Sequence, residues 1–101
     1  MNDLFQPTPV QQPLFQKTVQ ITNKRGLHAR ASAKFVTLAS GQTASVEVEK
    51  DGSIVAGTSI MGLMMLGAAN GDHVTISASG EDAEQALVLL VELVENKFGE
   101  D

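Results

Sequence analysis

His28 and His73 are the only two imidazoles in this 101-residue chain, which contains no cysteine. A neutral imidazole is a nucleophile and a weak base near neutral pH, so it can accept a phosphoryl group and release it again. His28 lies between Gly26 and Arg30, where a predicted helix begins. The free N–H groups of a helix start favour a nearby phosphoryl group, and a guanidinium can chelate its oxygens. These local features fit phosphoryl transfer at His28 as well as they fit an exposed histidine without a further role.

The other residue patterns indicate less chemistry. His73 begins a predicted strand and shares its polar side with hydroxyl side chains, which indicates a solvated surface histidine. The two histidines lack further ligands at a spacing typical of a metal site, and we expect neither metal nor cofactor. Residues 57–62 have the glycine spacing of a phosphate-binding loop, but Leu63 and Met64 stand where Lys and Ser or Thr are required. Nucleotide binding by that loop is therefore excluded.

Charge is unevenly distributed along the chain. The net charge of −5 argues against a nucleic-acid binder. Most of the basic side chains nevertheless fall in residues 17–34, which contain no Asp or Glu. They are Lys17, Lys24, Arg25, Arg30 and Lys34. A charge run usually marks a solvated face, but this run surrounds His28, which favours a basic docking surface there.

Composition indicates one small folded domain. Apolar residues make up 43% of the chain and the mean hydropathy is +0.02, as in ordinary soluble proteins. The apolar runs are far shorter than the roughly 20 residues that span a bilayer, and the N-terminus lacks the basic region of a secretory signal. We expect a cytoplasmic monomer without membrane contact. All three prolines lie in residues 1–14, which predicts a mobile N-terminal extension ahead of a domain at 15–101.

Three segments alternate apolar and polar residues with a period of two, which predicts strands with one buried face. These strands span residues 15–22, 44–49 and 73–79. The dipeptide Asp51-Gly52 follows the second of them and predicts a two-residue hairpin turn into a further strand near 53–57.

Helical spacing predicts three helices, at residues 29–40, 59–66 and 83–98. In the first, Ala29, Ala33 and Val36 form an apolar stripe, widened by Phe35 and Ala39, that is expected to pack close to the sheet. The last begins with Asp82 and Gln85, a pair that resembles a capping box.

The resulting order is strand, helix, strand, strand, helix, strand, helix. Because most strands have one polar face, helices can cover only one side of the sheet, so we predict a two-layer, open-faced α+β sandwich. A right-handed crossover between the first two strands leaves room for the last strand between them.

The short helix carries more apolar side chains than one helix face can bury. Leu63 and Leu66 are three residues apart and form the predicted core pair. Ile60, Met61 and Met64 then share another face, and flexible methionines suit a surface that meets several partners. Methionine at helical spacing is more often in the core, so the surplus of apolar positions is what favours an interface.

Two motifs resemble those of one protein family. Residues 26–30 (GLHAR) resemble the active-site motif of the HPr family of phosphoenolpyruvate-dependent phosphotransferase systems, and residues 59–62 (SIMG) resemble its regulatory serine motif. Both occur in the family's order, and the resemblance spans about residues 15–98. It implies a four-stranded antiparallel sheet with three helices on one face. The chain departs from the family at Ala31, where proline is frequent.

The resemblance also implies roles for single residues. His28 would carry the phosphoryl group, Arg30 would contact the phosphate, and Ser59 would be a regulatory phosphorylation site. Partner contacts are expected from Lys24, Arg25, Ile60, Met61 and Met64. The implied partners are an enzyme I-like donor fed by phosphoenolpyruvate, an enzyme IIA-like acceptor and a serine kinase or phosphatase.

Three hypotheses about function follow. The first is a phosphoryl carrier that passes the group from donor to acceptor without turning over a small molecule itself, in sugar uptake or in a nitrogen-linked regulatory branch. The second is a regulatory adaptor that acts by docking and by phosphorylation of Ser59. The third is a small-ligand-binding α+β module, which makes no use of the basic cluster around His28.

Overall fold

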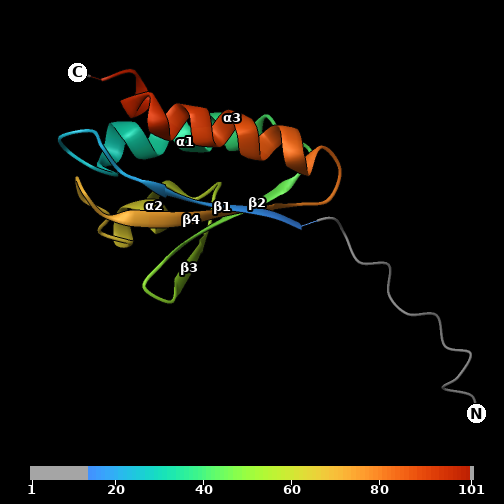
Figure 1. Cartoon of the computed structure of the whole chain (residues 1–101), viewed down its shortest axis with the longest axis horizontal. Helices are drawn as coiled ribbons and strands as arrows, with labels where there is room; N and C mark the ends of the chain where they lie inside the picture. The colour runs from blue at the N-terminus through green and yellow to red at the C-terminus, as the bar shows by residue number, and fades with distance from the viewer. Residues whose placement is uncertain (1–13, 101) are drawn as a thin grey trace, which may run out of the picture.

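The computed structural model describes residues 14–100. Its elements are β1 (Leu14–Gln20), α1 (Ala29–Ser40), β2 (Ser45–Lys50), β3 (Ser53–Ala56), α2 (Ile60–Met65), β4 (His73–Ser79), α3 (Ala83–Glu95) and the 3₁₀ turn η2 (Lys97–Gly99) (Figure 1). This order confirms the predicted fold class. The predicted N-terminal extension lies outside the described residues except for Leu14, which already belongs to β1. None of the helices within residues 14–100 is long and apolar enough to cross a membrane.

The four strands form one antiparallel sheet in the order β1-β4-β2-β3. β4 lies between β1 and β2, which confirms the crossover predicted from the sequence. The inward side chains of paired strands meet in the core, as Val19 does opposite Val74 and Val48 opposite Ile76. Asp51 and Gly52 have φ angles of 51° and 87°, the left-handed pair that a type I′ hairpin turn requires.

The outer face of the sheet is polar. Gln16 donates a hydrogen bond to Ser77 across β1 and β4 at 3.0 Å, and the Thr18 and Thr75 hydroxyls lie 2.8 Å apart. These cross-strand pairs replace apolar packing on the side that no helix covers. The helices must therefore bury their apolar faces against the opposite side.

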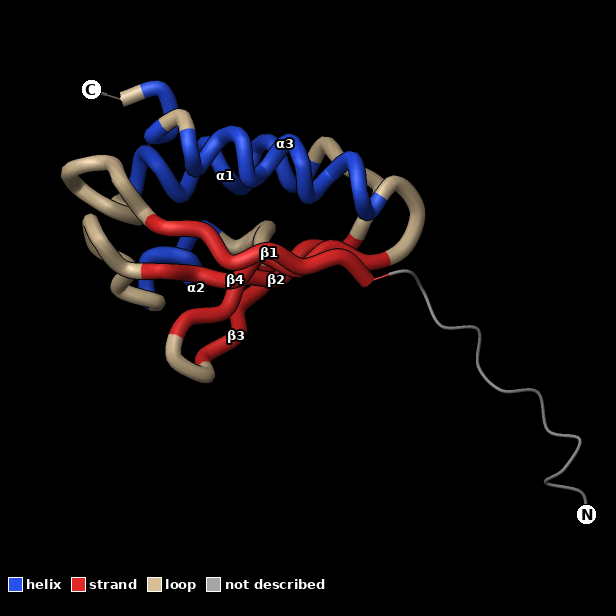
Figure 2. The backbone as a smooth tube through the Cα atoms, viewed as in Figure 1, coloured by secondary structure: helices blue, strands red, loops and turns tan. Residues whose placement is uncertain are grey.

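α1 and α3 lie side by side over the inner face of the sheet, as Figures 1 and 2 show. The side chains of α1 that enter the core are those of Ala31, Ser32, Phe35 and Ala39. The predicted stripe is therefore right at Phe35 and Ala39 and wrong at its other positions, since Ala29 is exposed and Ala33 and Val36 are only half-buried. Phe35, at 2% exposure, is the large apolar side chain that α1 can bury most fully, so its position sets the helix rotation.

α2 packs against α1 and β3. Leu63 and Leu66 are buried, which confirms the predicted core pair. Ile60, Met61 and Met64 are exposed, and Met65, which the sequence analysis did not single out, is 78% exposed.

α3 differs from its prediction at both ends. Asp82 adopts a left-handed conformation with φ 60° and its side chain caps no backbone N–H, so the predicted capping box does not form. The short connection from β4, with Gly80 at φ 93°, leaves Asp82 outside the extended conformation that an N-cap needs. The helix ends at Glu95, and Phe98, predicted to continue it, is buried instead from η2.

The two faces of α2 give a test of this packing. Leu63→Ala should lower the free energy of unfolding by about 2 to 5 kcal/mol, because the buried side chain leaves a cavity. Met61→Ala, on the exposed face, should change it by less than about 0.5 kcal/mol. Urea unfolding of both variants measures the difference, and equal losses would show that Met61 also belongs to the core.

Candidate functional site

His28 is the N-cap residue of α1, with an extended backbone (φ −75°, ψ −179°), and its carbonyl accepts the first hydrogen bond of the helix from the Ser32 amide at 2.9 Å. Its side chain makes no capping bond and is only partly buried, at 19% exposure. The imidazole is therefore available beside the free N–H groups of the first turn, which contains no acidic residue. A helix start of this kind favours an anion next to the ring.

The loop before α1 is fixed by close packing against the loop after α2. Leu27 donates its amide to the Ala68 carbonyl at 2.9 Å. Gly26 has φ +63°, and a Cβ at this position would lie 2.3 Å from the same carbonyl oxygen. Glycine is therefore required here for both conformation and space. The contact also brings the end of α2 next to the loop that carries His28.

Glu100 lies beside His28. His28 Nε2 and Glu100 Oε2 are 2.7 Å apart, and the other carboxylate oxygen accepts a hydrogen bond from Asn23 Nδ2 at 3.0 Å. Asn23 Nδ2 also donates to the Gly26 carbonyl at 2.8 Å. Asn23, Gly26, His28 and Glu100 therefore form one hydrogen-bonded unit that the sequence analysis did not anticipate.

A tight turn brings Glu100 to this position. Lys97, Phe98 and Gly99 have φ angles of 56°, 55° and 75°, so three consecutive residues are left-handed. Such conformations are unfavourable for residues other than glycine and persist where surrounding contacts hold them. Here Phe98 is buried at 1% exposure, and Lys34 Nζ donates to the Phe98 carbonyl at 2.7 Å. The turn is therefore fixed both to the core and to α1.

The surroundings of Glu100 favour its charged form. The hydrogen bond from the Asn23 amide lowers the pKa of this carboxyl below its ordinary value, and the His28 ring and the Lys34 charge act in the same direction. Partial burial acts in the opposite direction. Glu100 thus brings a stable negative charge into a region whose own sequence is basic.

The basic residues near His28 are exposed. Lys24, Arg25 and Arg30 are all open to solvent, and none of them forms a salt bridge with another residue in 14–100. Arg30 lies in the first turn of α1, two residues after His28. Its guanidinium is therefore free to take the oxygens of an anion bound at the helix start.

Ser59 is the N-cap of α2, and its Oγ accepts a hydrogen bond from the Gly62 amide at 2.9 Å. The exposed apolar side chains of α2 that follow it form what we call the α2 patch: Ile60, Met61, Met64 and Met65. Because the end of α2 contacts the loop before α1, this patch and the basic surface around His28 belong to the same part of the molecule.

Comparison with known proteins agrees with this arrangement. Residues 15–96 match the family model described as the PTS HPr component phosphorylation site. The chain belongs to the HPr family. The phosphocarrier protein HPr of Cupriavidus necator is 44% identical over 87 residues, which cover 86% of this chain and 98% of that protein. A phosphocarrier role in the phosphotransferase system is the role of this family.

Solved structures of HPr-type proteins share the fold. A crystal structure of HPr from Thermoanaerobacter tengcongensis has a TM-score of 0.83 and 48% identity, covering 86% of this chain and 98% of that one. A crystal structure of the Bacillus subtilis catabolite repression protein Crh, a dimer with a swapped domain, has a TM-score of 0.68 and 44% identity, covering 78% of this chain and 91% of that one.

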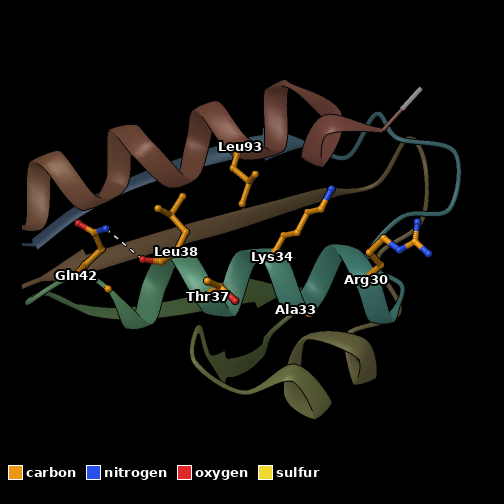
Figure 3. Close-up of a pocket in the computed structure, with 8 residues that line it drawn as sticks. Arg30, Ala33, Lys34, Thr37, Leu38, Gln42 and Leu93 are labelled. Atoms are coloured by element: carbon orange, nitrogen blue, oxygen red, sulfur yellow. Dashed lines mark hydrogen bonds between the residues drawn. The ribbon is translucent and has the colours of Figure 1, made fainter.

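An apolar groove of about 550 Å³ opens between α1 and α3 (Figure 3). Leu38 and Leu93 face each other across it, and Arg30 and Lys34 lie at the end nearest the loop before α1. Neither histidine lines the groove. His28 therefore lies outside this groove.

His73 takes part in none of these side-chain contacts within residues 14–100. It begins β4, pairs with Gln20 of β1 and is exposed, consistent with the solvated surface histidine predicted from the sequence. Glu100 is the residue that sequence reasoning missed. No local pattern indicates it, because the residues that hold it, Asn23 and His28, lie more than 70 positions away.

The lowered pKa of Glu100 predicts a pH-dependent contribution to stability. A carboxyl whose pKa is lower in the folded than in the unfolded state stabilises the fold above its ordinary pKa near 4.5, and this contribution disappears as the pH falls through the lower, folded value. Glu100→Gln should therefore destabilise the protein at pH 7, and by less at about pH 3. Thermal unfolding at both pH values, with exposed Glu95→Gln as the control, measures this. An equal destabilisation at both pH values would contradict it.

Proposed function

We propose that this protein accepts a phosphoryl group on His28 from an enzyme I-like donor, itself fed by phosphoenolpyruvate, and passes it to an enzyme IIA-like acceptor. The observation that carries the proposal is the partly exposed imidazole of His28 at the start of α1, free of any capping bond. A nucleophile in this place gains the field of the helix start for the phosphoryl group it receives.

Arg30 has the role of binding the phosphoryl oxygens. It lies in the same first turn and forms no salt bridge with the described residues that would have to break first. A planar guanidinium can donate two parallel hydrogen bonds to a phosphoryl group, and this contact strengthens as charge builds up during transfer. The protein is thus a carrier in a transfer chain rather than an enzyme that turns over a small molecule.

Partner docking is assigned to the α2 patch together with Lys24 and Arg25. The patch exposes methionines that are flexible enough to fit more than one partner surface, and the basic residues favour an acidic rim around it. The small-ligand hypothesis would instead place the ligand in the groove between α1 and α3. Neither histidine lines that groove, so this hypothesis gives His28 no role. Met61→Ala is the variant that removes docking area while the fold stays intact.

The carrier is proposed to act as a cytoplasmic monomer that holds no cofactor, since the phosphoryl group is its cargo. Sugar uptake and a nitrogen-linked regulatory branch would use the same chemistry at His28, and they differ only in the acceptor protein.

The phosphorylation site can be tested by intact mass. After incubation with phosphoenolpyruvate and an enzyme I, the wild-type protein should gain one phosphoryl group that is labile in acid and stable in base. His28→Ala should gain none, because the proposed nucleophile is gone, whereas His73→Ala should match the wild type. A phosphorylated His28→Ala protein would overturn the proposal.

A second role, regulation through Ser59, is favoured by one observation. Ser59 Oγ already lies 2.9 Å from the Gly62 amide at the start of α2, and the exposed α2 patch begins at the next residue. A phosphate on Ser59 would keep a favourable interaction with the helix start, so the fold would be retained. Its charge would lie beside the docking patch and repel an acidic partner.

The regulatory role predicts a separation of stability from transfer. Ser59→Asp should unfold at the wild-type temperature or above, because aspartate is also a good N-cap residue. Phosphoryl transfer to His28 should slow and recover in part as the donor concentration rises, since the defect is in association. Unchanged transfer at every donor concentration would leave Ser59 as a structural cap. Ser53→Asp, at an exposed position in the β2–β3 hairpin, is the matched control.

A further inference from the structure

The groove between α1 and α3 has the size and lining of a small-molecule site (Figure 3). Its volume of about 550 Å³ lies within the range of about 300 to 1,000 Å³ that such sites occupy. Leu38 of α1 and Leu93 of α3 form its walls, and both are half-buried against the core. Small side chains keep the groove open, because Ala33, Thr37 and Gly41 line it at four-residue intervals along α1 and its C-cap.

The charged side chains that line the groove are both basic. Arg30 and Lys34 lie at the end nearest the loop before α1, and no acidic residue in 14–100 lines the groove. Arg30 is exposed and forms no salt bridge with these residues. Lys34 Nζ donates one hydrogen bond within this part of the chain, to the Phe98 carbonyl at 2.7 Å, so two of its three N–H donors remain for an anion. The lining thus changes from aliphatic to cationic along the groove.

The charge of Lys34 is not neutralised by a neighbouring carboxylate. Glu100 attracts Lys34 electrostatically, but the two side chains form no salt bridge in the described part of the chain. The carboxylate oxygens of Glu100 are instead engaged by Asn23 and His28. The basic end of the groove therefore has two positive charges available to an anionic ligand.

We propose that this groove binds an amphipathic carboxylate, of which a fatty acid is the simplest kind. The aliphatic chain lies between Leu38 and Leu93, where it gains free energy by leaving water. The carboxylate lies at the basic end, where a guanidinium can donate two parallel hydrogen bonds to it. An amphiphile with a cationic head would lose this second contribution, and a small inorganic anion would lose the first.

Occupation of the groove should oppose phosphorylation, a consequence that rests on the proposed carrier function. Arg30 is also the side chain proposed to bind the phosphoryl oxygens, and one guanidinium cannot pair fully with two anions at once. A bound fatty acid therefore disfavours a phosphoryl group on His28. Because coupling between two binding events is reciprocal, phosphorylation of His28 weakens the binding of the fatty acid by the same factor. The ligand needs no contact with the imidazole for this effect.

Binding can be measured with decanoate, kept below the concentration at which it forms micelles, by ¹H–¹³C spectra of the leucine and isoleucine methyl groups. Decanoate should shift the signals of Leu38 and Leu93 until they saturate, while exposed Ile54 of β3, which does not line the groove, should not respond. Decyltrimethylammonium has the same chain with a cationic head. It should bind at least about tenfold more weakly, because the basic end gives it no hydrogen bonds and repels it. Inorganic phosphate should leave both leucines unchanged.

Two variants separate the parts of the site. Ala33→Leu places a larger side chain in the groove and should weaken decanoate binding by about tenfold or more. Its matched control is Val88→Leu, which enlarges an exposed aliphatic side chain of α3 outside the groove and should bind decanoate as the wild type does. Arg30→Gln leaves the groove open but removes one charge, so it should weaken decanoate binding by about tenfold without weakening that of decyltrimethylammonium. Thermal unfolding shows that each variant is folded.

The outcomes distinguish this site from the carrier function. Wild-type protein without a saturable response to decanoate, or wild-type affinity in folded Arg30→Gln, would overturn the inference. Protein phosphorylated on His28 should bind decanoate about fivefold more weakly or less tightly still, the range typical of coupled sites. Equal affinity of the two forms would overturn the link to transfer. A wild-type protein that takes no phosphoryl group on His28 would instead overturn the proposed function, and the decanoate titration would still decide whether the groove is a binding site.

Discussion

A sheet with apolar side chains on one face only is the constraint from which the rest of the molecule follows. The inward residues of the strands, such as Val48 and Ile76, must be covered, while outward polar side chains pair across the strands, glutamine with serine and threonine with threonine. Every amphipathic helix therefore has to bury its apolar face in a single core. This restriction places the start of α1, the end of α2 and the turn after α3 close enough to share hydrogen bonds.

Local sequence patterns were sufficient for much of this fold. Alternation predicted β4 at His73–Ser79 to the residue, and the Asp51-Gly52 pair predicted the hairpin turn between β2 and β3. Both patterns depend on side chains that are neighbours in sequence. The rotation of α1 was not predictable in the same way. Its alanines fit either face, and only the packing of Phe35 in the assembled core decides between them. The missing cap at Asp82 likewise reflects the tight connection from β4 rather than the residue itself.

The candidate site likewise contains residues that local sequence indicates and one that it does not. His28 and Arg30 are close in sequence, so their motif and helix position could be recognised from the chain alone. Glu100 could not, since its contact with His28 depends on how α3 ends and on the left-handed turn around Phe98. The result is a site in which local sequence supplies the positive charge and a distant segment supplies the single carboxylate.

The strand order also bears on how the molecule is made. β1 pairs with β4, so Leu14 can form its strand contacts only after Ser79 has been synthesised. His28 likewise contacts Glu100, which lies 72 positions further along the chain. Contacts between such distant residues require large loops to close and slow folding relative to a chain built from local contacts. During synthesis on the ribosome, the imidazole of His28 emerges long before Glu100, whose carboxylate contacts it in the folded domain, has been added. The surroundings of His28 are thus among the last parts of the domain to be completed, so a truncated chain carries the histidine without Glu100.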